Sequence, residues 1–219
     1  MGSPVNEWLQ PLWYSTWREI TKLLFESLYA YERLGTRHLP HTGPALIVAN
    51  HQSFFDPPLI GDCFEDRQFY PVARSELFEV PLFGSAIAML NSIPIRQGRV
   101  DTSAIKQIIH RLESGHPVLI FPEGSRTHDG TIQPFERGIG VILRRTRVPV
   151  IPAAIDGAFD AWPRSRPFPR FFGQRLRVLF GTPIMPGFLP GNPDDAVALL
   201  ERRVRALFDE LRSIDPRRG

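Results

Sequence analysis

The sequence predicts an α/β fold, with one main domain preceded by an amphipathic helix. Short apolar runs alternate along the chain with segments in which apolar residues recur at every third or fourth position, which is the pattern of strands alternating with helices. A chain of 219 residues with 42% hydrophobic residues can bury one sizeable core. We therefore expect a helical segment over residues 1–36 and the main domain over residues 37–219.

The N-terminal helix is predicted over residues 13–31. Apolar residues from Trp13 to Tyr31 recur at helical spacing, charged residues lie between them, and Gly35 follows as a stop. The aromatic-rich stripe of this helix either packs on the core or lies in a membrane interface, and the pattern favours neither outcome.

In the main domain, apolar runs predict strands, while helical periodicity and capping residues predict helices. Asp101 is a candidate N-cap and Gly115 a stop for one helix, and Asn192 followed by Pro193 begins another. The predicted strands are residues 45–49, 69–73, 118–121, 150–154 and 176–180. The predicted helices are residues 57–64, 102–113, 138–145 and a last one from residue 192.

The composition argues against a membrane-spanning or disulfide-bonded protein. No run of about 18 apolar residues is present, and the nearest candidate, residues 80–95, contains Pro81, Gly84 and Pro94. Cys63 is the only cysteine, which excludes an internal disulfide and suits a reducing compartment. The N-terminus has no signal-peptide pattern, so we expect a cytoplasmic location.

A histidine and an aspartate five positions apart follow the first predicted strand, in the sequence N-H-Q-S-F-F-D. Histidine has an ordinary pKa of about 6.5 and can act as a general base near neutrality. A carboxylate on its second nitrogen would orient the ring, so His51 and Asp56 are candidate catalytic residues. Pro57 makes Asp56 equally suited to be a helix N-cap, a purely structural role. No G-x-S-x-G motif is present, so we expect the substrate to supply the nucleophile.

The segment F-P-E-G-S-R-T, from Phe121 to Thr127, leaves a predicted strand at the edge where α/β proteins bind ligands. Arg126 would suit a phosphate, and Glu123 could hold its guanidinium in place. An ordinary polar turn with a surface ion pair is the alternative. The remaining histidines show no metal-ligand spacing, so no metal is expected.

Four sequence blocks, in this order and at these separations, resemble those of the glycerolipid acyltransferases, especially the bacterial 1-acylglycerol-3-phosphate acyltransferases. They are N-H-Q-S-F-F-D, I-P-I-R, F-P-E-G-S-R-T and V-I-P-A-A, and the resemblance runs over residues 44–158. The first and third blocks are specific, and the others support them by position. The chain departs from the family pattern at Arg74 and Ser75, where two lysines are common, which leaves the choice of acceptor open.

The resemblance implies a single mixed sheet flanked by helices and a direct acyl transfer without an acyl-enzyme. His51 would deprotonate the free sn-2 hydroxyl of 1-acylglycerol 3-phosphate, Asp56 would orient His51, and phosphatidic acid would be the product. The donor would be acyl-CoA or acyl-ACP (acyl carrier protein), with no bound cofactor. The implied phosphate-binding residues are Arg126, Glu123, Gly124, Ser125, Arg96 and Arg74, and the implied acyl-donor region is Val150, Ile151 and Pro152.

A lipid substrate implies a peripheral location on the inner face of the cell membrane. Two segments are candidate membrane contacts: the N-terminal helix and residues 159–175, where aromatic residues alternate with arginines. The second segment is otherwise an ordinary loop whose aromatic residues pack on the sheet. No nucleic-acid motif accompanies it, so nucleic acid is not an expected partner. Transfer to another lysolipid or to glycerol 3-phosphate, thioester hydrolysis, and lipid binding without catalysis are the alternative functions.

Overall fold

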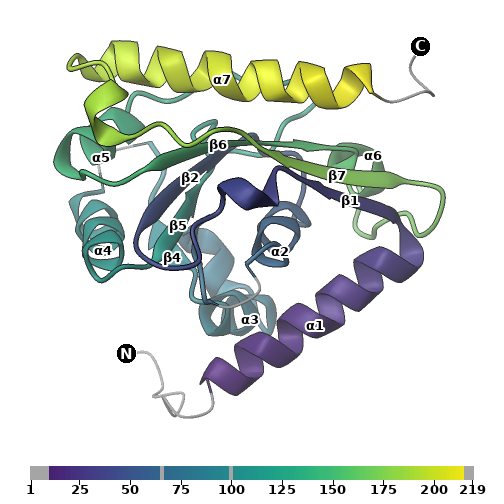
Figure 1. The fold of residues 1–219 in the computed structure, drawn as a ribbon. Coiled ribbons are helices and arrows are strands. Elements are labelled where there is room, and N and C mark those ends of the chain that lie inside the picture. The colour runs from purple at the N-terminus through teal and green to yellow at the C-terminus, as the bar shows by residue number, and fades with distance from the viewer. Residues whose placement is uncertain (1–9, 65–66, 99–100, 215–219) are drawn as a thin grey trace.

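A seven-stranded mixed sheet forms the centre of the molecule (Figure 1), and it confirms the predicted fold class. The computed structural model describes residues 10–64, 67–98 and 101–214. The strand order is β1-β7-β6-β2-β5-β3-β4, and every neighbouring pair is parallel except β6 and β7. The strands are β1 (Ala30–Leu34), β2 (Ala45–Ala49), β3 (Tyr70–Arg74), β4 (Ile93–Ile95), β5 (Pro117–Ile120), β6 (Val150–Asp156) and β7 (Arg175–Phe180).

Helices cover both faces of the sheet. Strand β2 is buried throughout, with Leu46 and Val48 facing one core cluster and Ile47 and the flanking alanines facing the other. Side chains alternate between the faces of a strand, so a strand covered on both faces is a continuous apolar run. The helices are α1 (Gln10–Leu28), α2 (Asp56–Gly61), α3 (Phe83–Met89), α4 (Thr102–Glu113), α5 (Ile139–Arg145), α6 (Ala158–Ala161) and α7 (Pro193–Ser213).

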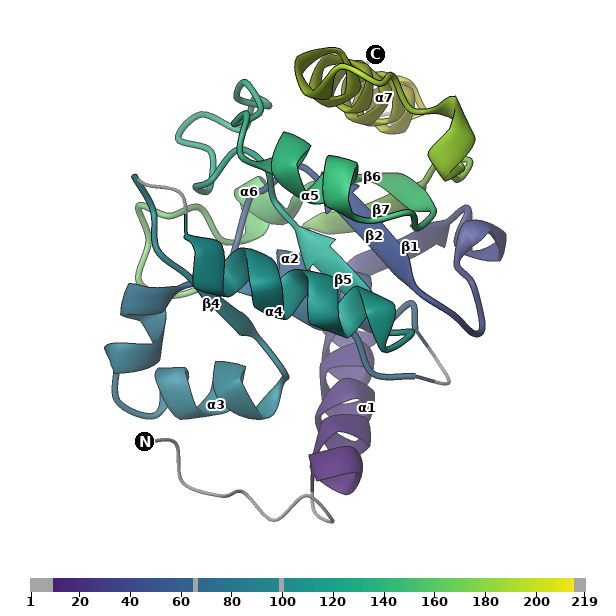
Figure 2. The ribbon, with the colours of Figure 1, turned by 90° about the vertical axis from the view of Figure 1, so that its left-hand side faces the viewer.

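The two faces carry different helices (Figures 1 and 2). Helices α4, α5 and α7 pack on one face, and α1, α2 and α6 pack on the other. The caps proposed for α4 and α7 are confirmed. Asp101 accepts from the backbone N–H groups of Ser103 and Ala104, and Asn192 accepts from the N–H of Asp194 at 2.8 Å.

The N-terminal helix ends earlier than expected, and the segment after it belongs to the sheet. Helix α1 stops at Leu28, and β1 then pairs in parallel with β7. The expected boundary after residue 36 therefore falls beyond a strand of the main sheet. The sequence of β1 contains Glu32 and Arg33 and has only partial burial, so no apolar run announces it.

Helix α1 both packs on the core and leaves apolar residues in solvent. Tyr14 and Phe25 are buried, and Thr21 Oγ1 donates to Asp62, the residue that follows α2, at 2.9 Å. Ile20 and Leu23, in contrast, are 51% and 67% exposed. Within the described residues, no helix combines the length and apolar character needed to cross a bilayer.

Helix α3 was not predicted, because Pro81 and Gly84 argued against a helix there. The structure shows why a glycine is needed: a Cβ on Gly84 would lie 2.1 Å from the carbonyl oxygen of Phe78. Residues Ser75–Glu79 form the short 3-10 helix η2, against which α3 turns back.

Candidate active site

The histidine motif begins where β2 ends, next to the carboxyl ends of β5 and β6. Asn50 follows β2 directly, and its side-chain amide bonds both backbone groups of Ile155 in β6, at 2.8 and 2.9 Å. This side chain continues the pairing one residue beyond the strand. Asn50 is therefore fixed against β6, and the chain leaves the sheet at the next residue, His51.

His51 and Asp56 are in direct contact. His51 Nδ1 lies 2.7 Å from Asp56 Oδ2, and the imidazole stacks on the ring of Phe121 with centroids 4.0 Å apart. The Asp56 side chain is fully buried, whereas that of His51 is 18% exposed. The acid is thus shielded and the histidine is accessible.

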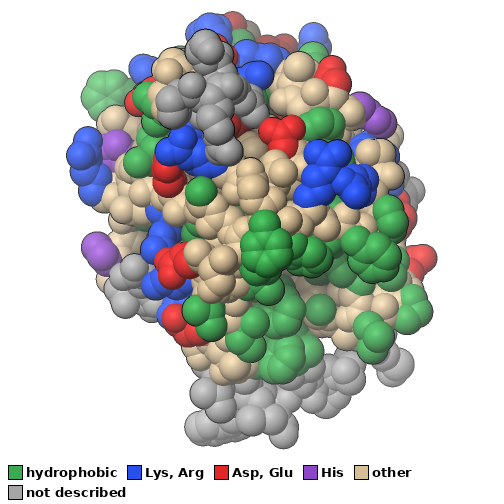
Figure 3. All heavy atoms as spheres, turned by 90° about the vertical axis from the view of Figure 1, so that its right-hand side faces the viewer, with side chains coloured by type: hydrophobic (Ala, Val, Ile, Leu, Met, Phe, Trp, Pro, Cys, Tyr) green, Lys and Arg blue, Asp and Glu red, His purple; other side chains and the backbone are tan. Residues whose placement is uncertain are grey.

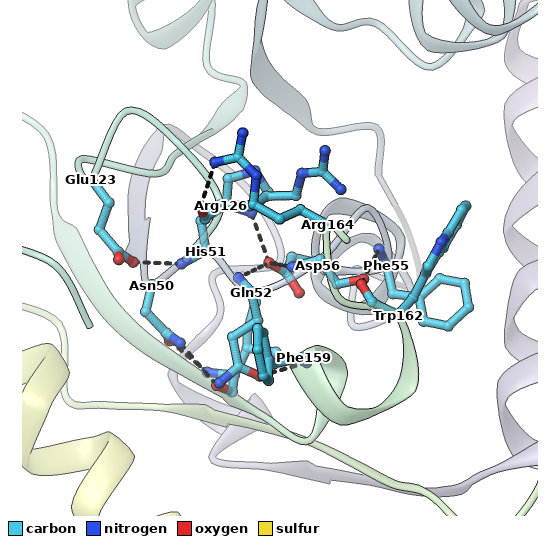
Figure 4. A network of polar contacts seen from close by, with 12 residues as sticks. Asn50, His51, Gln52, Phe55, Asp56, Glu123, Arg126, Phe159, Trp162 and Arg164 are labelled. Atoms are coloured by element: carbon cyan, nitrogen blue, oxygen red, sulfur yellow. Dashed lines mark hydrogen bonds and ion pairs between the residues drawn. The ribbon is translucent and has the colours of Figure 1, made fainter. Parts of the chain in front are cut away.

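Asp56 is not the N-cap that the sequence indicated. It is the first residue of α2, and Phe55 precedes the helix without a side-chain cap. Asp56 Oδ2 instead accepts from the backbone N–H groups of Gln52 and Ser53, and it thereby closes the turn that carries His51 (Figure 4). The same oxygen orients the His51 ring and holds the turn together.

These contacts define the protonation pattern of His51. Because Asp56 Oδ2 already accepts two backbone N–H groups, His51 Nδ1 is the donor in their contact. Nε2, on the far side of the ring, is left with its lone pair, and His51 lines a cavity. A general base and its orienting acid would have this arrangement.

Glu123 holds the backbone of His51 and does not pair with Arg126, contrary to expectation. Its carboxylate accepts from the N–H of His51 at 2.6 Å and from the N–H of Gln133 at 2.8 Å. Thr127 donates to the carbonyl of His51 at 2.8 Å, so both backbone groups of the histidine are fixed. Burial raises the pKa of Glu123 to about 7, although the two N–H donors oppose this shift.

Arg126 lies flat over the ring of Phe54, with 3.6 Å between its guanidinium carbon and the ring centroid. Burial lowers the pKa of Arg126, and the nearby Arg164 and Arg74 lower it further. Arg164 donates to the backbone carbonyl of Arg126 at 3.5 Å, and the two side chains lie on the same side of the histidine turn (Figure 4). Positive charges gathered in this way favour an anionic ligand.

A cavity of about 960 Å³ connects these groups. Gly124, Ser125 and Arg126 line it together with Arg74 and Arg96, which come from β3 and the end of β4. Arg164 lines it as well, although it lies outside all four sequence blocks. Gly124 has a φ of 70°, a left-handed conformation that favours glycine.

Away from these arginines the cavity lies between α1, α2 and α3 and is mostly apolar, with Arg18, Thr21 and Asp62 as polar residues of its lining. Its walls include side chains from each of these helices, among them Trp17, Leu24, Pro58, Phe83 and Ile87. A space with an apolar body and a few convergent charged groups suits an amphipathic ligand. Among the described residues, no His, Cys, Asp or Glu cluster is arranged to hold a metal ion.

The proposed acyl-donor residues Val150, Ile151 and Pro152 do not reach the cavity. They form the beginning of β6, where all three are buried and pair with β2. Their position is the opposite end of the strand from the site, because β2 and β6 are parallel and His51 follows the end of β2. In the structure these three residues form part of the central sheet and its buried core.

Arg164 and the backbone contacts of Glu123 were not predicted. Arg164 comes from a segment 38 residues beyond Arg126, and no motif marks it. The backbone contacts of Glu123 could not be found from side-chain patterns, since any residue can supply an N–H. The pairing of β2 with β5 in the sheet brings the ends of these two strands together, and the segments that contain His51 and Glu123 therefore meet.

An accessible histidine oriented by a buried aspartate, beside arginines and an apolar cavity, defines an acyltransferase-type site. A family model described as "Acyltransferase" matches residues 32–156, and the chain belongs to this family.

Three proteins that are similar to the chain are all named as acyltransferases of 1-acylglycerol 3-phosphate. A 1-acyl-sn-glycerol-3-phosphate acyltransferase of Pseudomonas aeruginosa is 32% identical over 184 residues, covering 82% of this chain and 68% of that protein. The chloroplastic enzyme BAT2 of Brassica napus, of the same name, is 30% identical over 138 residues, which is 62% of this chain but 40% of the plant protein. The crystal structure of the 1-acyl-sn-glycerophosphate (LPA) acyltransferase PlsC from Thermotoga maritima superposes with a TM-score of 0.78 at 26% identity, covering 95% of this chain and 83% of that one.

Proposed function

We propose that the protein transfers a fatty acyl group from a thioester to the sn-2 hydroxyl of 1-acylglycerol 3-phosphate, giving phosphatidic acid. The observation that carries this proposal is the position of His51, which contacts Asp56 and lines a cavity that has arginines near the histidine and is mostly apolar beyond them. The names of the similar proteins support the same acceptor.

In the proposed reaction, His51 Nε2 removes the proton of the acceptor hydroxyl, and the resulting oxygen attacks the thioester carbonyl carbon. The tetrahedral intermediate then expels the thiolate, which takes the proton back from His51. Asp56 stabilises the imidazolium between these steps. The N–H groups of Gln52 and Ser53 are bonded to Asp56, so the oxyanion must find other donors.

The arginines of the cavity bind the phosphate of the acceptor. Arg126 is held against Phe54, and Arg74, Arg96 and Arg164 border the same space. Guanidinium groups match phosphate oxygens in geometry and charge. The acyl chain occupies the apolar part between α1, α2 and α3, and the donor is acyl-CoA or acyl-ACP.

A water-insoluble substrate requires contact with a membrane, so we infer a peripheral protein on the inner face of the cell membrane. The apolar residues that α1 leaves exposed support this inference. Leu23 is 67% exposed and lies outside the cavity, whereas Ile20 lines it together with Trp17 and Leu24 on the same helix. The helix thus offers one apolar surface to lipid and another to the bound substrate.

The test measures thiol release from acyl-CoA and from acyl-ACP, with and without lysophosphatidate. Release should depend on the acceptor, and His51→Ala should lower kcat by about 10²-fold or more because the general base is lost. His110→Ala, an exposed histidine in α4, is the matched control and should retain full activity.

Each alternative predicts a different result in the same assay. Release without any acceptor would indicate a thioesterase, and preference for a phosphate-free lysolipid would contradict the role given to the arginines. Lipid binding without turnover of either donor would indicate a binding module.

A further inference from the structure

The segment between α6 and β7 exposes three phenylalanines in strongly basic surroundings. We call residues 163–173 the rim segment. Phe168, Phe171 and Phe172 are 75%, 53% and 66% exposed, so they do not pack on the sheet. Arg164 and Arg166 precede Phe168 in the sequence, Arg170 lies between Phe168 and Phe171, and no acidic residue occurs from Trp162 to Gln174.

Backbone hydrogen bonds hold the rim segment in this shape. The N–H of Arg170 donates to Ala161 at 2.7 Å, and the indole of Trp162 donates to the carbonyl of Arg166 at 3.1 Å. Phe172 has a φ of 68°, a conformation that costs energy for a bulky residue. The exposed rings are therefore presented by a defined backbone.

The rim segment also joins the active site. Trp162, the residue before the rim segment, and Arg164, near its beginning, line the cavity, and Ser53 Oγ in the histidine turn donates to the carbonyl of Trp162 at 2.9 Å. Figure 3 shows the face on the right-hand side of Figure 1. Hydrophobic side chains gather on the lower part of this face, and basic side chains lie above and beside them. Leu82, just before α3, adds a further side chain that is 87% exposed.

We propose that the rim segment docks on the surface of an anionic lipid bilayer. Its phenylalanine rings enter the interface, and Arg166 and Arg170 contact the lipid phosphates. The docked protein turns the arginine-lined part of the cavity toward the lipid acceptor, so the inference rests on the proposed function. A bilayer fits better than a protein partner because the exposed rings are accompanied by three arginines and by no acidic residue from Trp162 to Gln174.

The experiment compares the partition of the full chain into vesicles of phosphatidylcholine alone and of an equimolar mixture with phosphatidylglycerol. One variant combines Phe168→Ser, Phe171→Ser and Phe172→Asn, since asparagine tolerates a positive φ. It should lower partition into the mixed vesicles at least about 30-fold, through the apolar area it removes. A second variant, Arg166→Gln with Arg170→Gln, should lower it about 25-fold and should not alter partition into phosphatidylcholine.

Matched controls are Phe188→Ser, which changes a ring that is 79% exposed in η3 (Pro186–Phe188), and Arg202→Gln with Arg203→Gln on α7. Both controls should bind as the wild type does. Wild-type partition in the rim variants, or equal losses in the controls, would overturn the proposal. So would normal vesicle binding combined with loss of transfer from acyl-ACP alone, because that result would make the rim segment a protein-binding site.

A second readout separates this proposal from the proposed function. Transfer to a short-chain lysophosphatidate, kept below its micelle concentration, needs no bilayer and should be the same in the rim variants and the wild type. Absence of this transfer in the wild type would contradict the proposed function, whatever the vesicles show.

Discussion

At the scale of single residues, the site combines local and distant contacts. The spacing of His51 and Asp56 allows a hydrogen bond between them because the carboxylate also binds two N–H groups of the intervening turn. These contacts lie within six residues, and the sequence motif therefore predicted the pair. The capping role that the sequence also allowed for Asp56 was wrong, because side-chain direction depends on the turn and not on composition.

Replacing Asp56 by asparagine should lower kcat by about 10² to 10⁴-fold with little change in KM. The asparagine carbonyl oxygen would replace Oδ2, on which three N–H groups converge, but the residue would lose the negative charge that orients His51 and stabilises its imidazolium. Steady-state kinetics with lysophosphatidate measure this effect, and Asp209→Asn on the exposed face of α7 is the control. A loss smaller than tenfold would argue against an orienting role.

Glu123 and Arg126 come from one motif but should affect different kinetic constants. Glu123→Gln places an amide N–H₂ against a buried N–H donor and displaces His51, so kcat should fall about 10 to 100-fold while KM for lysophosphatidate stays nearly constant. Arg126→Gln removes a charged phosphate ligand and should raise that KM about tenfold or more. If both variants changed KM alone, Glu123 would belong with the phosphate ligands.

At the scale of elements, the contact between α1 and α2 contains a buried carboxylate that the reaction does not use. Asp62 Oδ1 accepts from Thr21 in α1, and Oδ2 has no hydrogen-bond partner among the described residues. Burial raises the pKa of Asp62 from 3.8 to about 7, although Thr21 and nearby cations oppose the shift. The native protein therefore binds this proton more tightly than the unfolded chain does.

Stability should accordingly fall as the pH rises from about 4 toward and through 7, by an amount on the order of 3 kcal/mol from Asp62. Glu123, with its raised pKa of about 7, adds a change of the same sign. Urea unfolding at several pH values measures the slope, which Asp62→Asn should reduce and Asp62→Asn with Glu123→Gln should nearly remove. An unchanged slope in the double variant would contradict the assignment.

Elements differ in how well the sequence predicted them. Helix α4 was predicted with its observed bounds, because a cap, a periodic apolar face and a glycine stop all agree. Strands β1 and β4 lie at the two edges of the sheet and have five and three residues. Strand β1 is covered incompletely and needs no apolar run, and β4, although apolar, is too short for periodicity to detect it.

At the scale of the whole molecule, the order of the strands explains the site. β2 and β5 are neighbours in the sheet, although the chain between them forms β3, β4 and several helices. Parallel neighbours bring their carboxyl ends to one edge, which places the histidine turn beside Glu123. The sequence predicted the two segments and the contact between His51 and Asp56. It did not predict the backbone contacts between them or the position of Arg164, since these depend on the pairing of strands distant in the chain.

The stacking of His51 on Phe121 has a spectroscopic consequence. The imidazole and phenyl planes are inclined by only 12°, so the aromatic ring current of Phe121 shields the carbon-bound protons of the imidazole. Among the six histidines of the chain, the base should have proton resonances displaced to high field. The protonation of this one ring can then be followed in the intact enzyme, without a substrate and without a label.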